Sequence, residues 1–225
     1  KKYNSNQESY NMWRNHISSF GIGEWMNNDF VSGTKGILPK HEYYNKYYGR
    51  TSWNSSTIIS MAIGQGELLL TPIQMANISA IIANRGFYFT PHIVKSVEGN
   101  EKIDTTFLEK KYTTINPKHF DVIIEGMEKV IKKSDGTANN IKSNSISICG
   151  KTGTAQNPHG EDHSIFIAFA PKENPEIAIA VYIENGGWGS TWAAPIAGLM
   201  IEKYLKADIN LDVEKFITNG VINSK

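Results

Sequence analysis

Three stretches decide the fold of this chain: SISICGKTGT at 145–154, SIFIAFA at 164–170 and IAIAVYI at 177–183. The second and third are apolar at nearly every position, which indicates central strands whose two faces are both covered by helices. The residues from Lys172 to Pro175 form a turn that joins them at hairpin distance. The sequence therefore predicts an α+β fold, in which a central antiparallel sheet is flanked by helices.

Four segments outside the strands carry helix signals. Two of them begin with an N-capping residue and a proline, Thr71-Pro72 and Asn116-Pro117. The second continues with apolar residues at i, i+3, i+4 and i+7, the pattern of an amphipathic helix. Shorter helices are expected over Ser9–Phe20 and Trp192–Leu205. Glycine, proline and clustered tyrosine between Val31 and Asn54 predict a long surface loop instead.

The composition is that of an ordinary globular domain. A chain of 225 residues can enclose a sizeable core. Its 23 basic and 22 acidic residues nearly balance, so there is no electrostatic reason to expect nucleic acid as a partner. No apolar run reaches the ~18 residues of a membrane span. The polar start from Lys1 to Tyr10 also lacks the apolar core of a signal peptide. We therefore expect no anchor or export signal within the chain.

The tetrad Lys151-Thr152-Gly153-Thr154 is the motif that carries chemistry. Together with Gly150 it could belong to a phosphate-binding loop, G-x-x-x-x-G-K-[ST]. That motif needs glycine at position 145, where this chain has Ser145, and a helix after the lysine. An apolar strand before the tetrad fits better the K-T-G element of penicillin-binding serine acyl-transferases. A three-residue match by itself is equally compatible with an ordinary exposed strand end.

Each residue type in the tetrad suits acyl transfer. Lys151 would supply positive charge near a substrate carboxylate, to which the hydroxyls of Thr152 and Thr154 could donate hydrogen bonds. Gly153 would leave room for a substrate backbone beside the strand edge. The backbone N–H of Thr154 could help to stabilise a tetrahedral oxyanion, an effect worth about 3 kcal/mol per donor in acyl-transfer enzymes.

Several separated segments resemble the penicillin-binding protein family. They are the run from Lys151 to Gln156, HSIFIAFAP at 163–171, the block from Gly64 to Ala76 and the turn Glu184–Gly187. Their order is that of the class B enzymes, specifically the elongation-type penicillin-binding protein 2 group. The resemblance covers roughly residues 10–205. It implies the penicillin-binding and serine β-lactamase-like transpeptidase fold.

The resemblance implies a D,D-transpeptidase that cross-links peptidoglycan through a serine acyl-enzyme. The implied partners are D-Ala-D-Ala stem peptides, β-lactam antibiotics and cell-elongation proteins, and no cofactor is implied. The implied location is the periplasmic face of the bacterial inner membrane. The tetrad at 151–154 would be catalytic, with Thr152, Thr154 and Gln156 binding substrate.

K-T-G also serves carboxypeptidases and β-lactamases, and a catalytically dead binding module is a further alternative. The Gly64–Ala76 block favours the transpeptidase.

The family also needs an S-x-x-K and an S-x-N motif, and the matches in this chain are poor. Ser32–Lys35 has the first spacing and Ser52–Asn54 the second, but roughly one match of each arises by chance. The nucleophile should open a helix, so that the lysine one turn later faces it. The glycines and the proline that follow Ser32 argue against a helix there. We therefore expect the nucleophile and its lysine upstream of residue 1.

It follows that the fold should be incomplete at its N-terminal side. We expect residues 1–206 to be the C-terminal portion of a transpeptidase domain, residues 207–225 to be a polar tail, and this chain alone to be inactive. His159 and His163, with two acidic residues between them, are interpreted as a solvated turn rather than a metal site. Cys149 should share a face with Lys151, as a small buried residue rather than a reactive thiol.

Overall fold

The computed structural model describes residues 5–30, 32–96 and 105–223. The chain divides into two compact units. The first consists of Lys1–Gln74 and Phe87–Ile115, and the second of Met75–Gly86 and Asn116–Lys225. Within the described residues, no helix is long and apolar enough to cross a membrane.

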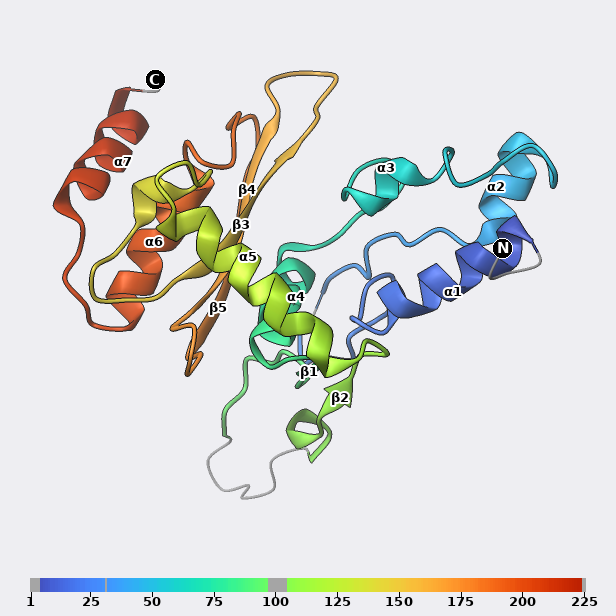
Figure 1. Ribbon diagram of the computed structural model, residues 1–225, viewed down its shortest axis with the longest axis horizontal. Helices are drawn as coiled ribbons and strands as arrows, with labels where there is room; N and C mark the ends of the chain where they lie inside the picture. Colours follow the sequence, from blue (N-terminus) through green and yellow to red (C-terminus); the bar gives the residue numbers. More distant parts are fainter. Residues whose placement is uncertain (1–4, 31, 97–104, 224–225) are drawn as a thin grey trace. The chain divides into compact units, whose positions relative to one another are not determined.

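The second unit is built on a three-stranded antiparallel sheet with the order β3-β4-β5 (Figure 1). The strands are β3 (Cys149–Ala155), β4 (His163–Ala170) and β5 (Ile177–Ile183). The prediction of central strands is confirmed for β4. It is wrong for β5, which has one strand partner among the described residues. β5 is nevertheless apolar because helix α6 packs against it.

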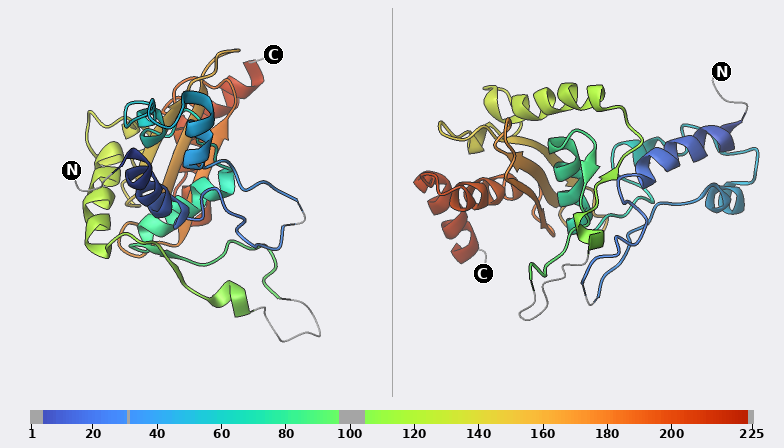
Figure 2. Two further views of the ribbon diagram at one scale, coloured as in Figure 1. Left: turned by 90° about the vertical axis from the view of Figure 1, so that its right-hand side faces the viewer. Right: turned by 90° about the horizontal axis from the view of Figure 1, so that it is seen from below.

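Helices cover both faces of this sheet. Helix α6 (Ala193–Tyr204) packs on the face that carries Phe166 and Ala168. Helix α5 (Phe120–Lys132) packs on the opposite face, against Cys149 and Phe169. Figure 2 shows α5 and α6 on either side of the strands. The predicted α+β arrangement is therefore confirmed, because alternate residues of the strands contribute to two separate apolar layers.

Helix α5 follows the predicted amphipathic pattern. Its first turn is the 3₁₀ segment η2 (Pro117–His119), where the Asn116 side chain accepts a hydrogen bond from the N–H of Lys118. The buried face carries Phe120, Ile124, Met127 and Ile131. The capping residue and the apolar spacing thus define the helix in the sequence and in the structure alike.

The strand expected over 145–154 begins later than predicted. β3 starts at Cys149, because the Ser143 hydroxyl accepts hydrogen bonds from the N–H groups of Ser145 and Ile146. Such local hydroxyl–backbone bonds compete with a strand ladder. Ile146 and Ile148 are buried all the same, so the apolar pattern before β3 reflects core packing without strand pairing.

Residues 207–225, expected as a polar tail, contain helix α7 (Leu211–Asn223). α7 contacts α6. The ring of Phe216 stacks on that of Trp192, with centroids 5.2 Å apart and planes inclined by 20°. Near the end of α6, the buried Glu202 carboxylate accepts a hydrogen bond of 2.9 Å from the N–H of Asn210. These contacts attach the last segment to the second unit.

An aromatic cluster forms the core of the first unit. Tyr10 from α1 (Asn6–Ser18), Tyr44 from α2 (His41–Tyr48) and Trp53 are all buried. The Tyr10 and Tyr44 rings meet edge to face, with centroids 5.4 Å apart. The long surface loop predicted over 31–54 is therefore wrong in part. Tertiary packing of Tyr44 stabilises a short helix whose local sequence gives no clear signal.

Helix α4 (Pro72–Ala83) begins as the sequence predicts. The Thr71 hydroxyl accepts from the N–H of Gln74, and the Gln74 side chain accepts from the N–H of Thr71, which is a capping box. The amide nitrogen of the buried Gln74 also donates to the carbonyls of Gly21 and Lys35, both at 3.0 Å. One side chain thus caps the helix and fixes two loops.

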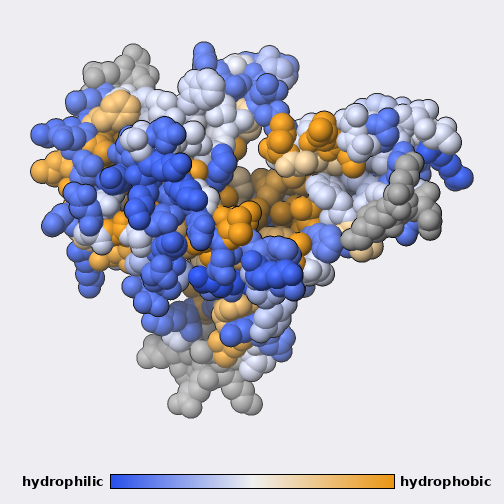
Figure 3. Space-filling model, in the orientation of Figure 1, coloured by the Kyte–Doolittle hydropathy of each residue, from blue (hydrophilic) through white to orange (hydrophobic). Residues whose placement is uncertain are grey.

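The remaining elements of the first unit are short. They are helix α3 (Ile59–Ala62), the 3₁₀ segment η1 (Thr105–Leu108) and a pair of two-residue strands, β1 (Phe87–Tyr88) and β2 (Lys111–Tyr112). Figure 3 shows apolar side chains at the surface over α3, where Ile59 and Ile63 are exposed. In the second unit, the remaining 3₁₀ segment is η3 (Asn139–Ile141).

Candidate functional site

Strand β3 holds the tetrad 151–154 at one edge of the sheet. Among the described residues its strand partner is β4, with Lys151 opposite Ile167 and Thr154 opposite Ser164. Alternation places Lys151 on the same face as Cys149, as predicted, and Thr152 with Thr154 on the other. Among the described residues no strand pairs with the other edge of β3, so an extended ligand could add there as a further strand.

Lys151 is exposed, and its ammonium donates a hydrogen bond of 2.7 Å to the carbonyl of Thr152. No carboxylate within the described part of the chain lies within ion-pair distance of it. Its charge is therefore held close to the strand and is available to a negatively charged ligand.

Two threonine hydroxyls from different elements meet beside the lysine. The Oγ1 atoms of Thr152 and Thr137 lie 3.0 Å apart, within hydrogen-bond distance. Thr137 belongs to the turn between α5 and η3, and nothing in the sequence pattern singles it out. Thr154 is half-buried, and Gln156 is exposed just beyond the end of β3. The structure thus brings together the predicted tetrad and one further hydroxyl.

Glycine is required at two positions around the tetrad. A Cβ at Gly150 would collide with the ring of Phe166. A Cβ at Gly189 would collide with the backbone of Gly153 and of Ile165. The turn that contains Gly189 is fixed by Ser164, whose hydroxyl donates to the carbonyl of Trp188 and accepts from the N–H of Ala193. Close packing therefore restricts the position of the tetrad backbone on the side that faces β4.

Cys149 is fully buried between the sheet, α4 and α5. Burial raises the pKa of its thiol to about 12, and the negative charge of Glu128 acts in the same direction. A thiol held in its protonated form is a poor nucleophile. The prediction of a small buried residue is therefore confirmed.

The two weak motif matches lie outside helices and strands. Ser32–Lys35 forms no helix, so Ser32 and Lys35 are not placed on one helical face. In Ser52–Asn54, Trp53 is buried in the aromatic core and donates to the Asn45 side chain. The Asn54 side chain accepts from the N–H of Ser56, closing a turn. Neither segment has the geometry that its spacing suggests.

The turn predicted around His159 and His163 is confirmed only in part, because His163 is the first residue of β4. The Asp162 carboxylate accepts from the N–H of Asn157, and Nδ1 of His163 accepts from the N–H of Asn185. Within the described residues, no group of three or more histidine, cysteine or acidic side chains could hold a metal ion.

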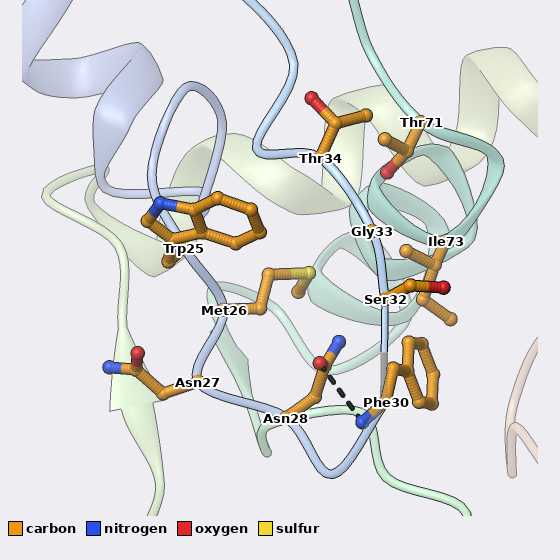
Figure 4. Close-up of a pocket in the computed structure, with 10 residues that line it drawn as sticks. All are labelled: Trp25, Met26, Asn27, Asn28, Phe30, Ser32, Gly33, Thr34, Thr71 and Ile73. Atoms are coloured by element: carbon orange, nitrogen blue, oxygen red, sulfur yellow. Dashed lines mark hydrogen bonds between the residues drawn. The ribbon is translucent and has the colours of Figure 1, made fainter.

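The first unit contains a pocket of about 440 Å³, which none of the tetrad residues lines. Figure 4 shows Met26 and Asn28 pointing into the space between Trp25 and Phe30, whereas Asn27 points away. Ser32, Thr34 and Thr71 contribute hydroxyl groups, and the lining residues include no charged side chain. Ser32 therefore lies beside a pocket whose described lining offers no charged side chain that could activate its hydroxyl.

The sequence matches the penicillin-binding protein transpeptidase domain over residues 5–202. The chain therefore belongs to this family. Among curated proteins it is similar to the peptidoglycan D,D-transpeptidase MrdA of Haemophilus influenzae. The two are 32% identical over 232 aligned positions, which cover 93% of this chain and 35% of the relative. The chain thus spans about a third of the length of that relative.

Two solved structures show the same fold. One is PBP2 of Pseudomonas aeruginosa in complex with WCK 5153, with a TM-score of 0.74 and 32% identity over 88% of this chain and 47% of that one. The other is the imipenem acyl-enzyme complex of penicillin-binding protein A from M. tuberculosis. Its TM-score is 0.68, with 26% identity over 87% of this chain and 42% of that one. The relatives named here agree with the predicted penicillin-binding protein 2 group.

Proposed function

We propose that the protein containing this chain is a peptidoglycan D,D-transpeptidase that acts at the periplasmic face of the bacterial inner membrane. The observation that carries the proposal is the edge strand β3, where an exposed ammonium and threonine hydroxyls surround Gly153. Membership of the transpeptidase family and the name of the Haemophilus relative support it.

In this proposal, the tetrad is the binding and oxyanion wall of the active site. Lys151 attracts the terminal carboxylate of a D-Ala-D-Ala stem peptide, and Thr152 and Thr154 donate hydrogen bonds to it. Gly153 lets the peptide backbone lie against the strand edge. Gln156 binds the substrate beyond the end of β3. The N–H of Thr154 donates to the oxyanion, which removes part of the barrier to acyl transfer.

The reaction proceeds through an acyl-serine. The serine oxygen attacks the carbonyl carbon of the penultimate D-alanine, and the peptide bond to the terminal D-alanine breaks as its nitrogen gains a proton. An amine of a neighbouring stem peptide then attacks the acyl-serine, forming the cross-link and restoring the hydroxyl. A β-lactam acylates the same serine by ring opening. The imipenem acyl-enzyme complex of the M. tuberculosis protein supports this part of the proposal.

We further propose that this serine is not a residue of the present chain. The non-helical conformation of Ser32–Lys35 supports this, because the lysine of S-x-x-K must face the serine across one helical turn. Residues 1–206 would then be the C-terminal portion of the transpeptidase domain, with 207–225 as an appended segment. Cell-elongation proteins would bind to other parts of the complete protein.

Labelling with a fluorescent penicillin tests this function. We expect the complete protein to take up one label per molecule, on a serine outside residues 1–225, and the present chain to take up none. Incubation with stem peptides should then give cross-linked dimers together with free D-alanine. Stoichiometric, Ser32-dependent labelling of this chain would contradict the assignment of the nucleophile. Release of D-alanine without dimers would identify a carboxypeptidase, and rapid loss of the label would identify a β-lactamase. A complete protein that takes up no label would be a dead binding module.

A further inference from the structure

Thr137 approaches the proposed carboxylate site from outside the K-T-G strand. Its hydroxyl oxygen lies 3.0 Å from that of Thr152, and either atom can be the donor. Among the described residues, Thr152 is the one hydrogen-bond partner of the Thr137 side chain. This contact joins the turn after α5 to the strand that would bind substrate.

The backbone on both sides of Thr137 is firmly held. The N–H of Gly136 donates to the carbonyl of Lys133, and the N–H of Ala138 donates to that of Val130, both at 3.0 Å. A Cβ at Gly136 would collide with the carbonyl of Val130, and Ala138 is fully buried. The Asn139 side chain donates to the carbonyl of Ile131. Because α5 packs on β3, this turn holds the Thr137 hydroxyl beside the strand.

The number of available protons determines which hydroxyl donates in the hydrogen bond between Thr137 and Thr152. A threonine hydroxyl has one proton to donate and two lone pairs that accept, whereas a carboxylate only accepts. If Thr152 donates to Thr137, Thr152 has no proton left to donate to the ligand. If Thr137 donates to Thr152, the Thr152 proton is free for the carboxylate, and the accepted bond strengthens the one that Thr152 donates. A bound carboxylate therefore selects the order Thr137, Thr152, carboxylate.

We infer that Thr137 is a positioning residue that aligns the Thr152 hydroxyl with the carboxylate of a stem peptide or β-lactam. The inference rests on the function proposed for β3. Thr137 would help to recognise the carboxylate. It would make no contact with the carbonyl group that reacts.

A double-mutant cycle in the complete protein tests this role. Thr137→Val removes the hydroxyl with little change of shape, Thr152→Val removes its partner, and the double variant closes the cycle. The measured quantity is the second-order rate constant of acylation by a β-lactam with a free carboxylate and by its methyl ester. Thr137→Ser, which restores a hydroxyl, is the rescue variant. Thr218→Val, at an exposed hydroxyl of α7, is the matched control.

With the free carboxylate, we expect Thr137→Val to lower the rate constant roughly tenfold, equivalent to about 1.4 kcal/mol. We expect little change with the ester, no further loss in the Thr152→Val background, and recovery in Thr137→Ser. Equal losses with both ligands, or additive losses in the cycle, would overturn the inference. An unchanged rate constant in Thr137→Val would also overturn the inference, but it would leave the proposed function intact. If the wild-type protein is not acylated at all, the proposed function and this inference fall together.

Discussion

Gly189 lies against the backbone of Gly153, so close that a Cβ at residue 189 would overlap the nitrogen and the carbonyl oxygen of Gly153. The two residues lie on different elements, one in the turn after β5 and the other in the K-T-G strand. This contact fixes the strand at the residue between Thr152 and Thr154. The position of the candidate site therefore depends on a turn that is distant in sequence.

Gly189→Ala should displace β3 at Gly153. The added methyl group also meets the carbonyl of Ile165, so neither neighbour can move without disturbing the β3–β4 ladder. We expect a loss of about 1–3 kcal/mol in the free energy of unfolding, measured by urea denaturation. Gly126→Ala is the matched control, since among the described residues no atom outside the helix backbone lies within 4 Å of its new Cβ. That substitution should stabilise the helix by about 0.5–1 kcal/mol. Equal effects of the two substitutions would contradict the packing argument.

Cys149 should be unreactive in the folded chain. A thiol reagent such as Ellman's reagent should label no cysteine under native conditions at neutral pH and one after denaturation. The pKa of the thiol rises from 9.0 to about 12 on burial, so its contribution to stability is complete below pH 9 and is lost as the pH rises toward 12. The Cys149→Ala variant should therefore lose stability less steeply than the wild type above pH 9. Rapid native labelling would show that the site is open to solvent.

The ion pair between Glu128 and Lys172 should make stability depend on acid pH. The two groups are 2.9 Å apart, and the hydrogen bond from Lys172 lowers the pKa of the Glu128 carboxyl. A lowered pKa contributes stability above the ordinary value near 4.5, and this stability is lost as the pH falls through the lowered value. Glu128→Gln should therefore flatten the acid limb of a stability profile and cost about 1 kcal/mol at neutral pH.

The control for that measurement is Glu125→Gln, because Glu125 is exposed on the same helix. It should leave the profile of the wild type unchanged. An identical acid limb in the wild type and in Glu128→Gln would show that the ion pair contributes nothing to the pH dependence.

Helix α7 should contribute to the stability of the second unit. Phe216 stacks on Trp192 of the segment that leads into α6, and such aromatic pairs are worth about 0.5–1.5 kcal/mol beyond area burial. Phe216→Ala should therefore lower the melting temperature of the chain, whereas Leu211→Ala, at an exposed residue of the same helix, should not. A melting temperature unaffected by both would show that residues 207–225 are an independent tail.

The sequence predicts those parts of the fold that local chemistry determines. The apolar runs of β4 and β5 and the Asn116 cap of α5 carry their signals within a few residues. Helix α2 has no such local signal, because it depends on the burial of Tyr44 against Tyr10, 34 residues earlier. The capping role of Gln74 also has a local signal, the capping-box spacing T-x-x-Q from Thr71.

The candidate site likewise combines residues that a local motif predicts with residues that only tertiary packing brings in. Lys151 and its neighbours can be predicted from the sequence, because they form a contiguous motif on one strand. Thr137 and Gly189 cannot, because each contacts β3 from another element, through residues that are far apart in sequence. Such contacts arise because α5 and the turn after β5 pack on the sheet. No sequence pattern predicts them.

The most direct test of the account is the acylation rate of Lys151→Met in the complete protein, measured with a fluorescent penicillin. Methionine keeps much of the length of the side chain and removes the charge that would attract the carboxylate. We expect a fall of roughly 10²-fold or more in the second-order rate constant, with an unchanged melting temperature. Acylation at the wild-type rate would contradict the claim that the K-T-G strand is the wall of the active site.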